Sequence, residues 1–249
     1  MRIETNHKLV RRNRRIAQYL FFFSMGALAA AFIAANAQAF SGSLPDPDTL
    51  EGKLALILPT LVLPIGVLAS LFSVRMTNLW IREPRPERAI QDGSKGLSNK
   101  SVLYNYYHIP ARHVLICPQG VYAITTRFQD GHFTVNGDQW TTRGGPFSGL
   151  LRIMRRDGIG NPGQDARRSA EHVQKLLDPI VSDIEVRPVV LFIDPRATVK
   201  IEKAELPILF ADPKQQPNLK DFLRDVPQAD RQPMTPEQIE AFEAATLAN

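Results

Sequence analysis

The sequence predicts a layered α/β or α+β domain that is preceded by two transmembrane helices. Two apolar runs without a charged residue, at residues 19–40 and 54–72, lie in the first third of the 249-residue chain. Beyond residue 81, short β-rich runs are separated by turn signals, and a segment of helical period and a further strand follow them. This order of elements is typical of a sheet covered by helices.

Each apolar run is close to the ~20 residues that a helix needs to cross a hydrocarbon core of roughly 30 Å. A helix satisfies its own backbone groups in lipid, so both runs are predicted to be helical. The segment between them, residues 41–53, is short and acidic. We therefore expect a basic tail at 1–16, a two-helix hairpin at 17–80 with an outer loop at 41–53, and a soluble domain at 81–249.

The charges around the two runs predict their orientation. Residues 1–16 hold six Lys and Arg against one Glu, and the second run is followed by Arg75, Arg82, Arg85 and Arg88. By the positive-inside rule, the tail and the C-terminal domain lie on the cytoplasmic side of the cell (inner) membrane, as parts of a multi-pass protein whose first partner is the lipid bilayer. The alternative is a signal peptide cleaved near residues 35–39, where small residues gather.

The net charge of +5 belongs to the tail rather than to the domain. From residue 81 onward, 22 Lys and Arg stand against 21 Asp and Glu. A nearly neutral domain argues against strong unspecific affinity for nucleic acid. The single cysteine, Cys117, excludes an intrachain disulfide and agrees with a reducing compartment.

Strand signals dominate the first half of the domain. Asp130-Gly131 and Asn136-Gly137 are hairpin signals, so we expect three or four antiparallel strands joined by tight turns. The predicted strands are 102–109, 113–116, 121–128, 132–135, 139–141, 186–193, 198–201 and 206–210. Helices are expected at 164–177, at 218–226, and after Thr235, where Pro236 and Gln238 complete a capping-box pattern.

Four short motifs resemble the nuclease-related domain (NERD) family, in the same order along the chain. They are HVLICPQGVYAI at 113–124, NPGQ at 161–164, VRPVVLF at 186–192 and TPEQ at 235–238. The resemblance covers roughly residues 90–247. It implies a restriction-endonuclease-like fold, in which a mixed sheet is flanked by helices, and a site of the PD-(D/E)XK type.

Such a site holds one or two Mg²⁺ ions with an Asp and a Glu, and a Lys two residues beyond the Glu stabilises the developing charge. The resemblance places Arg112 at the Asp, Thr125 at the Glu and Arg127 at the Lys, and Gln164 matches a glutamine of the following helix. Arginine cannot bind Mg²⁺, and threonine is a poor substitute for a carboxylate ligand. The side chains at these positions therefore predict neither a catalytic residue nor a metal ligand.

We therefore expect a pseudo-enzyme: a membrane-anchored NERD-like domain without a cofactor, which acts as a binding or scaffold module. Arg112 and Arg127 are phosphate-binding candidates, because guanidinium groups bind phosphate bidentately. Surface or structural roles are expected for a larger set, namely Arg152, Arg155, Arg156, Asp130, Asp138, His108, His113, His132 and Cys117.

Two alternatives stay open at this stage. In the first, the domain is a Mg²⁺-dependent nuclease acting on DNA or RNA with relocated ligands, for which Asp130 and Asp138 are the candidates. In the second, the chain is a structural membrane protein without a nucleic-acid role. Nucleic acid and a cytoplasmic protein both remain candidate partners, and the sequence does not predict whether the chain forms a homo-oligomer.

Overall fold

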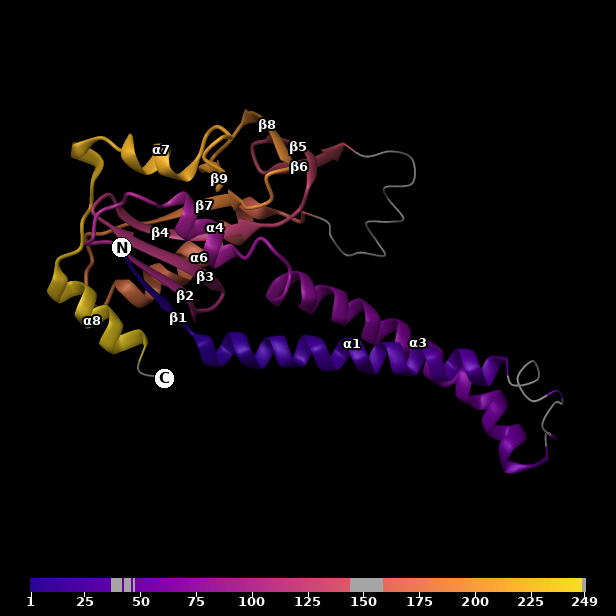
Figure 1. Cartoon of the computed structure of the whole chain (residues 1–249). Helices are drawn as coiled ribbons and strands as arrows, with labels where there is room; N and C mark the ends of the chain where they lie inside the picture. The colour runs from indigo at the N-terminus through magenta and orange to yellow at the C-terminus, as the bar shows by residue number, and fades with distance from the viewer. Residues whose placement is uncertain (37–41, 43–45, 47, 144–158, 248–249) are drawn as a thin grey trace. The chain divides into compact units, whose positions relative to one another are not determined.

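The computed structural model describes residues 1–36, 42, 46, 48–143 and 159–247 (Figure 1). The chain divides into two compact units. One comprises residues 1–9, 83–149 and 157–249, and the other comprises residues 10–82 and 150–156.

The first unit is built on a six-stranded sheet with the strand order β1-β2-β3-β4-β7-β9. These strands are β1 (Arg2–Thr5), β2 (Val102–His108), β3 (Ala111–Cys117), β4 (Gly120–Arg127), β7 (Val186–Phe192) and β9 (Ile208–Phe210). The pairs β2–β3 and β3–β4 are antiparallel, whereas β1–β2, β4–β7 and β7–β9 are parallel. The sheet is therefore mixed, and four helices flank it (Figure 1). This confirms the predicted fold class and is consistent with a nuclease-like fold.

Helices on both faces enclose the core. On one face, α6 (Pro162–Leu177) and α8 (Pro236–Thr246) cover the alternate residues of β3 and β4 that include Val114, Val121 and Ala123. On the other face lie α4 (Pro86–Gly93) and α7 (Leu219–Arg224). The predicted capping box of α8 is present, with Thr235 and Gln238 bonding each other's backbone N–H groups.

A smaller three-stranded sheet lies beside the main one, with the order β6-β5-β8. Its strands are β5 (Gly131–Asn136), β6 (Gln139–Arg143) and β8 (Ala197–Lys203). The hairpin predicted at Asn136-Gly137 is confirmed, because Asn136 pairs with Gln139 across the turn. The hairpin predicted at Asp130-Gly131 is wrong, since β4 pairs with β3 and β7 while β5 pairs with β6 and β8. The chain changes sheets at that point instead of turning back.

The N-terminus supplies an edge strand that the sequence did not predict. Strand β1 pairs in parallel with β2, from Arg2 opposite Val102 to Thr5 opposite Asn105. Met1 and Ile3 pack against the core below α4 and α7. Four residues are too few to show an alternation of apolar and polar side chains, so this strand within the basic tail could not be predicted from the sequence.

The second unit contains the two long helices α1 (His7–Ala35) and α3 (Leu50–Trp80). By length and composition, His7–Ala35 and Pro59–Trp80 are able to cross a membrane. Large apolar side chains are exposed along both helices, including Phe22 and Phe32 on α1 and Leu61 on α3. A soluble protein would be expected to bury them, so their exposure agrees with lipid contact.

Small residues line the contact between these two helices. On α1 the buried positions are Val10, Ala17, Ser24 and Ala31, which recur every seventh residue. On α3, Gly66 lies against α1, because a Cβ built there would stand 3.1 Å from Leu28 Cδ2 and 3.3 Å from Ala27 Cβ. A seven-residue period is typical of helices that pack at a small crossing angle. Near the basic ends of the helices, the Arg14 side chain donates to the carbonyl of Trp80 (3.0 Å).

The close approach at Gly66 leads to a prediction. Gly66→Val introduces a branched side chain against Ala27, which has no rotamer to adjust, so we expect overpacking to cost about 1–3 kcal/mol. The matched control is Gly26→Val, because a Cβ built on Gly26 meets no described atom within 4 Å apart from its chain neighbours and the nearby backbone of its own helix. Thermal unfolding of the full chain in a mild detergent should show a lower midpoint for Gly66→Val alone. Equal midpoints for the two variants would contradict this packing.

Candidate functional site

The residues that the resemblance assigns to a catalytic site lie on one face of the main sheet. In the β3–β4 register His113 faces Ile124, so Arg112 and Thr125 are the next opposed positions. Side chains alternate along a strand, and Thr125 and Arg127 therefore share the face of Val121 and Ala123. That face is the one that α6 covers. The structure thus places the Arg112, Thr125 and Arg127 positions near one another, on the side of α6.

The first turn of α6 closes this end of the sheet. Asn161 caps the helix, since its side-chain oxygen accepts the backbone N–H of Gln164 (3.0 Å), and Pro162 occupies the first helical position. The side chain of Gln164 is exposed. The next residue, Asp165, reaches the sheet, and sequence reasoning did not single it out.

Arg127 and Asp165 form the central contact of the site. Arg127 Nη2 lies 2.5 Å from Asp165 Oδ2, and Nη1 donates to the carbonyl of Thr126 (3.2 Å). The Arg127 side chain is only 13% exposed, whereas that of Asp165 is 51% exposed. Burial lowers the pKa of Arg127, and the Asp165 carboxylate opposes that shift. Arg127 Nε is buried and has no hydrogen-bond partner within the described residues.

The chemistry of this site differs from that of a magnesium site. Mg²⁺ takes oxygen ligands, above all carboxylates, and the assigned positions hold two arginines and a threonine. Asp165 does lie here, but its carboxylate is engaged by a guanidinium. Among the described residues, no group of three His, Cys, Asp or Glu side chains is arranged to hold a metal ion. The residues present at these positions therefore do not fit Mg²⁺.

Both relocated-ligand candidates contact arginines. Asp130 lies 3.2 Å from Arg196 Nη2, and Arg196 also binds the buried carboxylate of Asp194 (2.8 Å). Asp138, in the turn between β5 and β6, forms an ion pair with Arg167 of α6. Arg152, Arg155 and Arg156, for which surface or structural roles were predicted, lie outside the described residues.

A buried polar chain crosses the opposite face of the sheet. His113 Nδ1 is 2.8 Å from Asn105 Oδ1, and the Asn105 amide donates to Thr5 Oγ1 (3.2 Å). Burial, together with the charge of Arg112, lowers the pKa of His113 to about 3, so the imidazole is neutral at physiological pH. Tyr106, at φ +66°, follows Asn105 and donates its hydroxyl to Glu87 of α4 (2.8 Å). The sequence analysis missed this chain, because a single Asn inside an apolar strand is its only signal.

The other histidine and cysteine candidates are structural in this geometry. His108 Nε2 lies 3.0 Å from Thr246 Oγ1, and burial lowers its pKa to about 4. Burial raises the pKa of Cys117 to about 11, which disfavours the thiolate. His132 is exposed on β5.

The Arg127–Asp165 pair should contribute to the stability of the domain. Asp165→Ala leaves a mostly buried guanidinium without its carboxylate, and we expect a loss of about 1–2 kcal/mol, since half of the Asp165 side chain is solvated. Glu171→Ala is the matched control, because Glu171 is exposed on the same helix and makes no described ion pair. Urea unfolding of the full chain, followed by Trp140 fluorescence in a Trp80→Phe background, measures the difference. A similar midpoint for both variants would show that the pair is not stabilising.

Comparison with known proteins identifies one family in this chain. Residues 85–193 match the family model described as NERD, the nuclease-related domain. No curated protein and no solved structure matches the chain. The matched segment runs from the residue before α4 to the residue after β7 and contains Arg112, Thr125, Arg127 and Asp165. The resemblance seen in the sequence is confirmed over that segment.

Proposed function

We propose that this chain is a membrane-anchored, nuclease-related binding module whose site binds phosphate groups without hydrolysing them. The single observation that supports this proposal is the ion pair between the mostly buried Arg127 guanidinium and Asp165, at the position that the resemblance assigns to a catalytic lysine. Arg127 presents a fixed guanidinium at the N-terminal end of α6, where the helix dipole also favours an anion. Asp165 already supplies one anion, and a phosphate would have to replace it.

Nucleic acid is the ligand class that this site supports best. A phosphodiester offers the planar pair of oxygens that a guanidinium binds. The domain is nearly neutral, so the affinity should be modest and should fall with salt. A cytoplasmic protein partner and a purely structural role are the competing readings.

Cleavage and binding are tested together on the full chain in nanodiscs of zwitterionic lipid. The substrates are single- and double-stranded DNA and RNA, each with Mg²⁺, Mn²⁺ or EDTA. We expect retention of nucleic acid without metal-dependent cleavage. Asp165→Asn should strengthen binding several-fold because it removes the competing charge, and Arg127→Gln should weaken it. Glu171→Gln is the control and should match the unmodified chain.

Two outcomes of this assay would contradict the proposal. Metal-dependent cleavage that Asp130→Asn or Asp138→Asn abolishes would instead support a nuclease with relocated ligands. Retention that Asp165→Asn and Arg127→Gln leave unchanged would place binding elsewhere on the chain, and no retention at all would favour a protein partner or a structural role.

The proposed location is the inner membrane, with the N-terminus and the domain of residues 81–249 in the cytoplasm. The two apolar helices, the basic residues in the first turns of α1 and from Arg75 onward, and the acidic connecting segment support it. We infer that residues 41–53 face the opposite side.

Cysteine labelling tests this orientation. In a Cys117→Ser background, a membrane-impermeant maleimide should label Asp48→Cys in intact spheroplasts, because the connecting segment faces outward. It should label Glu237→Cys, at the exposed start of α8, only after lysis. Labelling of Glu237→Cys in intact spheroplasts would reverse the proposed orientation.

A further inference from the structure

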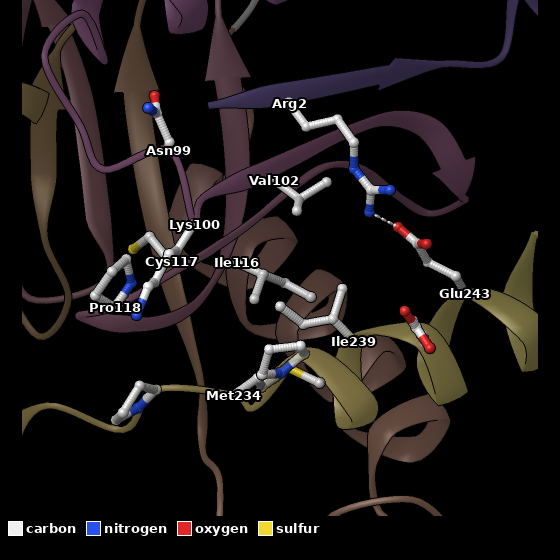
Figure 2. Close-up of a pocket in the computed structure, with 13 residues that line it drawn as sticks. Arg2, Asn99, Lys100, Val102, Ile116, Cys117, Pro118, Met234, Ile239 and Glu243 are labelled. Carbon is white, nitrogen blue, oxygen red and sulfur yellow. Dashed lines mark hydrogen bonds and ion pairs between the residues drawn. The ribbon is translucent and has the colours of Figure 1, made fainter.

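A pocket of about 470 Å³ opens between the main sheet and α8 (Figure 2). Its walls are β1, the end of the segment before β2, the start of β2, the end of β3, and the chain from Pro233 into α8. All of these elements belong to one compact unit. The volume falls in the range of pockets that hold small molecules.

The interior of this pocket is apolar. Its lining includes Val102 and Ile116 from the sheet, and Met234 and Ile239 from the opposite wall. Val102, Ile116 and Met234 are buried in the folded chain. Because each Å² of apolar surface removed from water contributes about 25 cal/mol, an apolar chain would gain affinity by filling this space.

The charged side chains on the rim differ in whether they already form an ion pair. Arg2 binds Glu243, which also accepts the hydroxyl of Tyr104 (2.5 Å), so this pair is neutralised. Lys100 is exposed, and its ammonium has no ion-pair partner within the described part of the chain. Figure 2 shows Lys100 and Glu243 on opposite sides of the apolar side chains Val102 and Ile116. The pocket therefore has an available cation at one end and acidic residues of α8 at the other.

We propose that this pocket binds an amphiphile, with its anionic head at Lys100 and its apolar chain over Val102, Ile116 and Met234. A fatty carboxylate and a phosphate-headed lipid share this chemistry. Glu240 also lines the pocket, one helical turn from Glu243 and without a described partner, so it repels an anion placed at that end. Charge thus sets the direction in which the amphiphile lies.

The pocket is distinct from the site at Arg127. Arg112 is near the start of β3, whereas Ile116 and Cys117 end the same strand. The inference therefore goes beyond the proposed function and does not depend on it.

Methyl NMR on the full chain in nanodiscs separates pocket binding from partitioning into lipid. The chain has five methionines, Met1, Met25, Met76, Met154 and Met234, whose methyl groups can be labelled with ¹³C. Met234 reports the pocket, while Met25 and Met76 lie in α1 and α3 and report the bilayer. The probes are decanoate, decyl phosphate and uncharged decanol.

We expect decanoate, decyl phosphate or both to shift the Met234 methyl resonance in a saturable way. The probe with the lower half-saturation concentration identifies the head group, carboxylate or phosphate, that the pocket prefers. Lys100→Gln should raise that half-saturation at least fivefold and leave the decanol response unchanged. Glu240→Gln should lower the half-saturation concentration, and Lys95→Gln, a surface control paired with Asp92, should not change it.

A Met234 methyl that no probe shifts overturns the proposal and favours a protein segment as the occupant. Equal effects of Lys100→Gln on decanoate and decanol overturn the assignment of the anionic head.

Discussion

The parallel pairing of β4 with β7 is the constraint on which this domain depends. Seven register pairs join the strands, from Val121 opposite Val186 to Arg127 opposite Phe192. Two parallel neighbours cannot be joined by a tight turn, so the chain must cross over before it returns. Here the returning segment is α6, which packs on β4 and runs back toward the start of β7. The N-terminal turn of α6 consequently meets the end of β4, and Asp165 reaches Arg127.

This arrangement concentrates positive potential at one point. The N-terminus of a helix carries a partial positive charge, and Arg127 adds a full charge that is mostly removed from water. A buried charge without a partner is strongly unfavourable, so the fold requires an anion there. The Asp165 carboxylate supplies it from the helix itself. Arg127 and Asp165 thus neutralise each other at this point of the fold.

Much of the fold follows from the sequence, because its strands are long enough to show their pattern. The segments predicted at 102–109, 121–128 and 186–193 correspond to β2, β4 and β7, and the predicted helix at 164–177 corresponds to α6. Strand β1 could not be predicted, since its four residues gain their conformation from pairing with β2. The turn at Asp130-Gly131 has the composition of a hairpin, but β5 pairs with β6 and β8 of the second sheet instead of with β4.

The sites were less predictable than the strands. Local sequence placed Thr125 and Arg127 on one face, but the carboxylate that meets Arg127 depends on the rotation of α6 about its axis, which only packing fixes. The contact between α1 and α3 shows the same limit. Residues in most positions of α1 are apolar or small, and only packing determines that the buried stripe is the sevenfold series through Ala17 and Ser24. The amphiphile pocket joins both ends of the chain and has no local signature.

The most direct test of this account is a Mn²⁺ titration of the full chain in zwitterionic nanodiscs, followed by the EPR signal of free Mn²⁺. If Arg127 and Asp165 take the place of a metal centre, the free signal should rise as in a protein-free titration, apart from weak binding that salt removes. Stoichiometric, salt-resistant uptake of Mn²⁺ that Asp130→Asn or Asp165→Asn abolishes would contradict the account and establish a metal site in this domain.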